Sequence, residues 1–174
     1  MLNNWNQLLN TDCVVIQVQD NFIYPIFRNG TTSLETVTDK EIINRDISAC
    51  QDIIVYVREP KQRFIKGLNE YCYQNNLDVK ETWQKVHRGE LVDRHFVPQF
   101  IWLLHLYKYY KGNVVLKDVG DIKQICTAHL NRTKKFTEVE VLDDFVRVDR
   151  ELDKYVNKST PLNQIIEECR HVLS

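Results

Sequence analysis

A cation, a glycine and three hydroxyls stand together in one short segment, which consists of Arg28, Asn29, Gly30, Thr31, Thr32 and Ser33. This combination suits a phosphate or sulfate group. Glycine lets backbone N–H groups approach an anion, hydroxyls donate hydrogen bonds, and a guanidinium adds a full charge in a bidentate fork. The nucleotide-triphosphate pattern G-x-x-x-x-G-K-[ST] is absent. The alternative is a turn that leads into an N-capped helix, with Arg28 in solvent.

A second group of cations begins at Arg58, which follows the apolar run 53–57. Lys66 lies about two helical turns further along, because Pro60 is suited to the first turn of a new helix. Arg58 and Lys66 could therefore approach one phosphate group from two sides. The alternative is a solvated basic helix face, which is the usual place for such a run of charge.

The elements that must position these residues are strands that alternate with helices. Short β-branched and aromatic runs predict strands at 14–18, 22–27, 52–57 and 114–116. Helices are predicted to begin at Thr31 and at Pro60, and another is predicted over residues 97–110. A further helix is predicted from one apolar face, made of Phe145, Val148, Leu152 and Tyr155. The last helix is predicted to begin with Thr160 as N-cap and Pro161 at the first position.

This alternation predicts an α/β fold of three layers, with a central, mainly parallel sheet flanked by helices. The length of 174 residues predicts a single domain, 1–174. Ligands of such sheets bind at the carboxyl ends of the strands. The segments 28–33 and 58–60 both follow predicted strands, so we expect them at that edge.

The overall composition limits which binding partners and which cellular compartment are expected. The net charge of −1 gives no general attraction to nucleic acid or membranes, and no apolar run is long enough to span a bilayer. The N-terminus lacks the features of a signal peptide. The five cysteines are dispersed without a Cys-x-x-Cys pair, and no His or Cys residues have ligand spacing. We therefore expect reduced thiols, no bound metal and a cytoplasmic protein.

Three segments in order resemble the sulfotransferases that use 3′-phosphoadenosine 5′-phosphosulfate (PAPS), and most closely the carbohydrate sulfotransferases. Residues 25–33 (PIFRNGTTS) resemble the family pattern P-K-x-G-[ST]-[ST]-S. Residues 57–66 (VREPKQRFIK) resemble V-R-[DE]-P-x-x-R-x-x-S, and residues 93–99 (DRHFVPQ) resemble D-x-H-[WF]-x-P-Q. The resemblance covers about residues 22–105 and implies a P-loop-like sulfotransferase fold.

The resemblance also implies which residues hold the donor PAPS. In the family, the first loop holds the 5′-phosphosulfate, which corresponds to residues 28–33 of this chain. The arginine of the second motif and the serine eight residues later hold the 3′-phosphate, which corresponds to Arg58 and position 66. Two positions depart from the pattern, because Arg28 replaces a lysine and Lys66 replaces the serine.

The implied reaction moves SO₃ from PAPS to an acceptor hydroxyl or amine, which by family analogy is on a carbohydrate, and it needs no metal. Arg28 would stabilise the leaving phosphate. His95 is the first choice for the general base, because histidine changes charge near neutral pH. Glu90 and Asp93 are the alternative bases, and a structural or donor-contact role for His95 stays open. His105, inside the apolar segment 97–110, is expected to be a core residue.

Two other classes of function remain in view. Another phosphate-handling transferase, such as a nucleotide kinase, would bind ATP in preference to adenosine 3′,5′-bisphosphate, and the missing nucleotide-triphosphate loop argues against it. A non-catalytic relative that binds PAPS or adenosine 3′,5′-bisphosphate would bind the donor without transferring sulfate. The changes at Arg28 and Lys66 keep this second alternative open.

Overall fold

The computed structural model describes residues 9–27, 29–127 and 136–173. Its centre is one sheet of six strands in the order β3-β1-β2-β4-β5-β6. The strands are β1 (Val14–Val18), β2 (Asn21–Ile23), β3 (Lys40–Ile43), β4 (Ile53–Val57), β5 (Asn113–Asp118) and β6 (Ser159–Pro161).

The sheet is mixed, and its parallel part lies in the middle. β4 pairs in parallel with β2 on one side and with β5 on the other. β1 is antiparallel to both β2 and β3, and β6 is antiparallel to β5. The prediction of a mainly parallel sheet therefore holds for the centre and not for the edges. Only Gln19 and Asp20 join β1 to β2, and so short a connection makes a hairpin and cannot make a crossover.

The strand predicted at 22–27 is shorter than expected. β2 ends at Ile23, although the backbone N–H of Tyr24 still donates to the Ile54 carbonyl at 2.9 Å. Pro25 follows, and it has no N–H with which to continue a ladder. Residues 24–27 are therefore irregular backbone that leads away from the sheet.

Six α-helices and several 3-10 segments surround the sheet in the described part of the chain. The α-helices are α2 (Thr31–Glu35), α3 (Pro60–Asn75), α4 (Val79–His87), α5 (Gln99–Tyr107), α6 (Arg147–Arg150) and α7 (Leu162–Arg170). The 3-10 segments are η2 (Asn44–Ala49), η3 (Val119–Gln124), η4 (Asp143–Phe145), η5 (Glu151–Tyr155) and η6 (His171–Leu173).

Two helix predictions need correction at their ends. The helix expected along residues 145–155 is a succession of short segments, η4, α6 and η5, although Val148, Leu152 and Tyr155 are buried as the spacing predicted. Thr160 is not the N-cap of the last helix. It pairs with Val114 in β6, and Pro161 takes the N-cap position instead.

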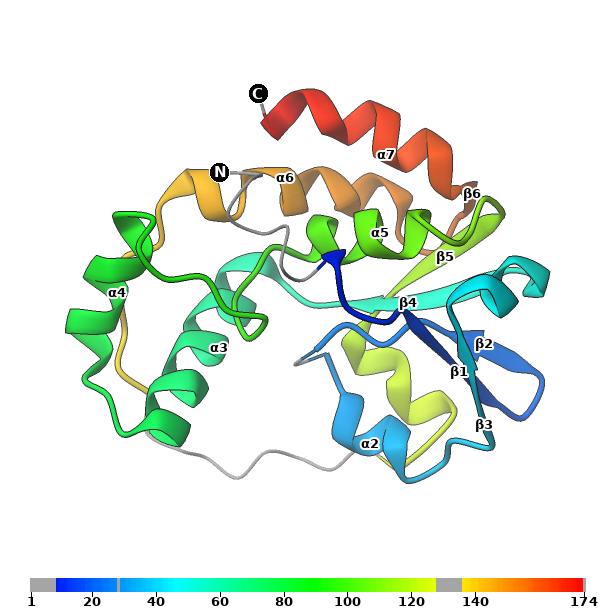
Figure 1. The fold of residues 1–174 in the computed structure, drawn as a ribbon, viewed down its shortest axis with the longest axis horizontal. Coiled ribbons are helices and arrows are strands. Elements are labelled where there is room, and N and C mark those ends of the chain that lie inside the picture. The colour runs from blue at the N-terminus through cyan, green and yellow to red at the C-terminus, as the bar shows by residue number, and fades with distance from the viewer. Residues whose placement is uncertain (1–8, 28, 128–135, 174) are drawn as a thin grey trace.

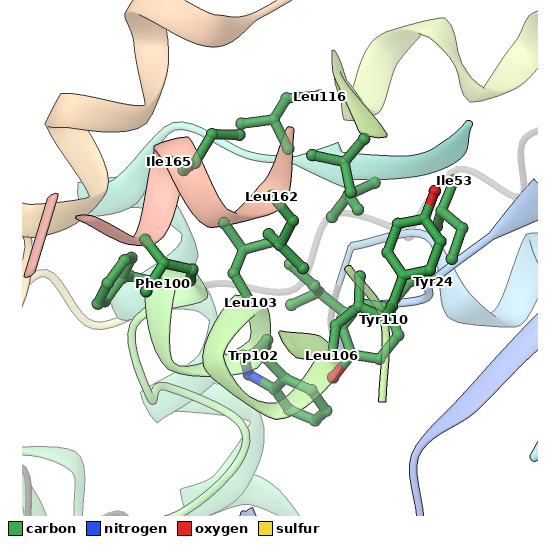
Figure 2. Close-up of a cluster of buried hydrophobic side chains, with 14 of the residues drawn as sticks. Tyr24, Ile53, Phe100, Trp102, Leu103, Leu106, Tyr110, Leu116, Leu162 and Ile165 are labelled. Atoms are coloured by element: carbon green, nitrogen blue, oxygen red, sulfur yellow. The ribbon is translucent and has the colours of Figure 1, made fainter. Parts of the chain in front are cut away.

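The helices form a layer on each face of the sheet, which confirms the α/β arrangement of three layers (Figure 1). On one face, α5 and α7 bring Phe100, Leu103 and Leu162 against Ile53 and Leu116 of the central strands (Figure 2). On the other face, Leu34 of α2 and Ile122 of η3 pack against Ile16, Ile23, Ile54 and Tyr56.

A separate apolar cluster holds α3 and α4 together beside the sheet. It contains Phe64, Leu68 and Cys72 of α3, Val86 of α4, and Phe96 from the segment that precedes α5. This cluster fixes the position of residues 93–97 relative to α3. None of the helices within the described ranges has the length and apolarity needed to cross a bilayer.

Candidate functional site

The site is built at one edge of the parallel pair β2–β4. Parallel strands point the same way, so the loop after β2 and the loop after β4 leave the sheet at the same edge. The first loop carries residues 29–33 and the second carries Arg58. The structure therefore brings the two predicted phosphate-binding segments to one place, whereas Arg28 lies outside the described residues.

Gly30 has a conformation and a position that only glycine fits. It is the N-cap of α2 with φ +81°, which is the left-handed region. A Cβ at this position would lie 2.5 Å from Cδ1 of Ile122 in η3. The backbone at Gly30 therefore lies directly on the apolar layer beneath it.

The hydroxyls of the loop differ in their access to solvent. Thr32 is exposed and Thr31 is half-buried, whereas Ser33 is 4% exposed. The described residues provide no side-chain hydrogen bond that caps the start of α2. Thr31, Thr32 and the backbone N–H groups of this first turn are thus the parts of the loop that can meet an anion.

Asn29 points into the protein. Its side chain is 1% exposed, and Nδ2 donates to the Tyr56 carbonyl at 2.9 Å and to Oε1 of Gln99 at 2.6 Å. We expected Asn29 to contact the donor, but the structure uses its amide to tie the first loop to β4 and α5. Its backbone N–H donates to the Ile26 carbonyl at 3.0 Å, so both the side chain and the N–H of Asn29 serve the protein interior.

Gln99 ties the second loop in the same way. Its Oε1 accepts a hydrogen bond from the backbone N–H of Arg58 at 2.8 Å, and its Nε2 donates to the Arg58 carbonyl at 2.9 Å. The side chain is 1% exposed. One amide at the start of α5 therefore contacts both loops, through Asn29 in the first and Arg58 in the second.

Asp149 of α6 holds the start of α5 in place. Its carboxylate accepts hydrogen bonds from the backbone N–H groups of Gln99 at 2.8 Å and Phe100 at 2.9 Å. Burial raises the pKa of this carboxyl group, and the two backbone hydrogen bonds and the charge of Arg63 oppose that rise. Asp149 replaces the missing side-chain cap of α5, whose N-cap residue is Pro98.

Arg63 of α3 is buried beneath the first loop. Its guanidinium donates to the Phe27 carbonyl at 3.0 Å and to the Val97 carbonyl. The side chain is 2% exposed. Arg63 therefore joins the residue before Arg28 to the segment before α5, and its role is internal.

Arg58 lies at the junction of β4 and α3, and Lys66 lies on the second turn of α3. Both side chains are half-buried. Glu59 between the strand and the helix is the N-cap of α3, and it accepts from the N–H groups of Lys61 at 3.1 Å and Gln62 at 2.7 Å. The carboxylate is thereby committed to the helix end.

His95 forms a pair with Asp93 next to the first loop. Its Nδ1 lies 2.5 Å from Oδ1 of Asp93, which also accepts from the His95 backbone N–H at 2.9 Å. The imidazole edge packs on Phe27 at 4.7 Å and on Tyr71 at 5.9 Å between ring centroids. Burial disfavours ionisation of Asp93, but the hydrogen bonds from His95 outweigh it and lower the Asp93 pKa.

This geometry separates the roles of the three candidate bases. The carboxylate of Asp93 is turned to His95, and the exposed Glu90 pairs with Arg88 at 3.0 Å. With Nδ1 donating to Asp93, the Nε2 of His95 keeps its lone pair. Nε2 is enclosed, and no described residue gives it a hydrogen-bond partner. An acceptor would reach Nε2 only after a neighbouring side chain moves.

A groove of about 430 Å³ runs beside the first loop. Its lining includes Phe27, Thr31, Glu35, Arg94 and Trp102. The guanidinium of Arg94 lies over the Phe27 ring, 4.9 Å from its centroid. The groove therefore offers aromatic and charged side chains next to Thr31.

His105 is a core residue, as its position in an apolar helix predicted. It is 3% exposed, Nδ1 bonds to the Tyr24 hydroxyl at 2.9 Å, and Nε2 bonds to the Thr11 carbonyl at 2.9 Å. Burial lowers its pKa. The five cysteines are free and buried. In the described ranges no group of three His, Cys, Asp or Glu side chains is placed to hold a metal ion.

Sequence reasoning missed the residues that connect the loops. Gln99 lies inside the motif 93–99 and Arg63 inside the motif 57–66, so membership of a motif was the signal that could have identified them. Asp149 had one weak signal, because it is an acidic residue between the apolar positions Val148 and Leu152. Comparisons with models of known families, with curated proteins and with solved structures found no match.

Proposed function

We propose that this protein transfers a sulfuryl group from PAPS to a hydroxyl or amine of a carbohydrate or another small molecule. The observation that carries the proposal is the junction at the edge of β2 and β4. There, Asn29 and Arg58, from the two motif-bearing loops, both bond to the side chain of Gln99. A donor with a 3′-phosphate and a 5′-phosphosulfate on one ribose needs two anion sites held next to one another, and this junction supports such a pair.

The first loop would bind the 5′-phosphosulfate. Thr31 and Thr32 would donate hydrogen bonds from their hydroxyls, and the backbone from Gly30 to Ser33 would donate from its N–H groups. Gly30 supports this role through its left-handed conformation, which turns the chain into the first turn of α2. By the family resemblance, Arg28 would neutralise charge on the leaving phosphate.

Arg58 and Lys66 would bind the 3′-phosphate. The Arg58 N–H donates to Gln99 Oε1, and Gln99 Nε2 donates to the Arg58 carbonyl, which supports a fixed backbone position for this side chain. Lys66 would add a second charge from α3. Two cations in place of the arginine and serine of the family suit a phosphate dianion.

In the proposed reaction, an acceptor oxygen or nitrogen attacks the sulfur atom. A new bond to sulfur forms as the bond from sulfur to the bridging phosphate oxygen breaks, and adenosine 3′,5′-bisphosphate leaves. His95 would take the acceptor's proton at Nε2, and Asp93 would hold the ring and stabilise its charged form. The groove beside Phe27 and Thr31 would receive the acceptor.

The compartment and the partners belong to the same proposal. Five free, buried thiols support a reducing compartment such as the cytoplasm. The net charge of −1 supports small-molecule substrates over nucleic acid. No metal is required by the proposed reaction.

Calorimetry with adenosine 3′,5′-bisphosphate and with ATP tests the proposal, followed by transfer of labelled sulfate from PAPS to a panel of sugars, phenols and amines. We expect the bisphosphate to bind at least about tenfold more tightly than ATP, a difference of about 1.4 kcal/mol, and label to reach an acceptor. Tighter ATP binding would favour a kinase. Binding without transfer would favour the non-catalytic alternative, which the enclosed Nε2 of His95 and the presence of Lys66 support.

A further inference from the structure

We propose that Gln99 is a positioning residue that holds the two phosphate-binding loops at a fixed separation. Both phosphate groups of one nucleotide then bind together more strongly than separate sites would allow. The inference rests on the proposed function, because it concerns a ligand with a 5′- and a 3′-phosphate. It adds a residue that contacts neither phosphate.

The geometry at Gln99 carries the inference. Oε1 accepts from Asn29 Nδ2 at 2.6 Å and from the Arg58 N–H at 2.8 Å, and Nε2 donates to the Arg58 carbonyl at 2.9 Å. All of these contacts join residues that are far apart in the sequence. One side chain with two polar atoms thereby sets the distance between the loop after β2 and the loop after β4.

The backbone ladder between β2 and β4 ends before it reaches the two loops. β2 pairs with β4 at Ile23 and Ile54, and the N–H of Tyr24 then donates to the Ile54 carbonyl. Beyond Tyr24 the chain is irregular. At Asn29 the loop is joined to the neighbouring elements through Tyr56 and Gln99.

Gln99 is itself held firmly. Its backbone N–H donates to Asp149 at 2.8 Å, and the side chains of Gln99, Asn29 and Asp149 are at most 3% exposed. Its side chain is closely surrounded by the groups it bonds to. A rigid, fully bonded amide of this kind transmits the position of α5 to both loops.

The physical consequence concerns how two anion sites act on one ligand. When one phosphate is bound, the second site meets its own phosphate at an effective concentration set by the distance between the sites. A fixed and matching distance raises that concentration, and loose loops lower it because they must be ordered on binding. A nucleotide with one phosphate needs one loop only, so it is insensitive to the separation.

The test uses Gln99→Met, which keeps the length of the side chain and removes its polar atoms. Binding of adenosine 3′,5′-bisphosphate, adenosine 5′-monophosphate and adenosine 3′-monophosphate is measured by calorimetry for the variant and the wild type. We expect affinity for the bisphosphate to fall about tenfold or more, which corresponds to about 1.4 kcal/mol. Each monophosphate should lose less than about threefold.

Asn69→Leu is the matched control. The buried amide of Asn69 also joins two segments, but it lies away from both loops. Its Nδ2 donates to the carbonyls of Ile65 and Thr137, and its Oδ1 accepts from the N–H of Thr137 at 2.8 Å. This variant should lose stability without changing the ratio of bisphosphate to monophosphate affinity. If Gln99→Met does not fold, Gln99→Asn replaces it, because it keeps an uncharged amide beside Asp149 but is one methylene too short to bond to both loops at once. In this variant the ratio of bisphosphate to monophosphate affinity should fall by a smaller factor than in Gln99→Met.

Two results would count against the inference. An unchanged ratio in the folded Gln99 variants, or an equal loss for all three nucleotides, would mean that Gln99 does not set the separation of the sites. If the wild-type protein binds none of the three nucleotides, the proposed function fails and the inference fails with it. The wild-type titration therefore separates the two failures.

Discussion

The backbone of Gly67 in α3 lies against the carbonyl group of His95, so closely that a Cβ on Gly67 would come within 1.9 Å of that oxygen. Two segments distant in sequence thus touch backbone to backbone. The contact sets how near the Asp93–His95 pair can lie to α3. A side chain at position 67 would have to push these segments apart.

Gly67→Ala should therefore destabilise the protein by about 1–3 kcal/mol, as overpacking of a core does. Helix propensity alone predicts the opposite sign, a gain of about 0.5–1 kcal/mol for this substitution in a helix. Urea unfolding gives the sign directly. Gly120→Ala is the comparison, because Gly120 is exposed and its Cβ would meet only the end of the Asp118 side chain. A stabilised Gly67→Ala variant would show that the contact is looser than described.

Gly30→Ala should cost about 1–3 kcal/mol, because alanine is strained at φ +81°. A second contribution comes from the approach to Ile122, and the double variant Gly30→Ala/Ile122→Val removes the methyl group involved. Ile122→Val alone serves as the reference for the double variant. Unfolding experiments should show that the double variant loses less than the sum of the two single variants. Full additivity would mean that the contact with Ile122 contributes nothing.

Asp93→Asn should lower stability at neutral pH by about 1.5–3 kcal/mol, the typical value of hydrogen bonds to a charged group. The folded protein holds the Asp93 pKa below its ordinary value. The ionised carboxylate therefore adds stability above the unfolded-state pKa of about 4, and this contribution disappears as the pH falls through the lower folded-state pKa. Unfolding of both proteins from pH 7 to pH 3 should show the difference shrinking below about pH 4. A constant difference would assign the loss to packing.

The sequence predicted the elements whose hydrophobic pattern is strong. The apolar run at 52–57 became β4, and the aromatic segment 97–110 contains α5, because a continuous apolar stretch has few alternatives to burial. The edges of the sheet were missed. β3 is a mixture of charged and apolar residues, and β6 contains Pro161, so neither carries a strand pattern.

The candidate site, too, could be predicted only in part from the sequence. Glycine, hydroxyls and cations after a strand predicted where an anion could bind, and the parallel pair β2–β4 brings those segments to one edge. The direction of each side chain could not be predicted. Asn29 looks like a ligand of the loop, yet its nearest partners are Tyr56 and Gln99, which follow far along the chain. Such contacts depend on tertiary packing and leave no local pattern.

Arg58→Ala should weaken binding of adenosine 3′,5′-bisphosphate about 10–100-fold, since it removes a charge-assisted contact of about 1.5–3 kcal/mol. Gln99 bonds to the backbone of Arg58, so the loop should keep its position without the side chain. Adenosine 5′-monophosphate should bind both proteins about equally in calorimetry. Arg88→Ala removes an exposed arginine that pairs with Glu90, and it should change neither affinity. Equal losses for both nucleotides would contradict the assignment of Arg58 to the 3′-phosphate.

His95→Asn separates an enzyme from a binder. The asparagine amide takes the place of Nδ1 and can still donate to Asp93, so the fold is largely spared, but nothing replaces Nε2. If Nε2 is the base, turnover should fall about 10²–10⁴-fold while affinity for adenosine 3′,5′-bisphosphate stays nearly constant.

Arg28 completes this test. Arg28→Ala should instead reduce donor binding and transfer together, since the family resemblance assigns it to the 5′-phosphosulfate. The measurements are initial rates of sulfate transfer and calorimetry with the bisphosphate. If His95→Asn mainly weakens nucleotide binding, His95 contacts the donor, and if it lowers only the free energy of unfolding, the Asp93–His95 pair is structural.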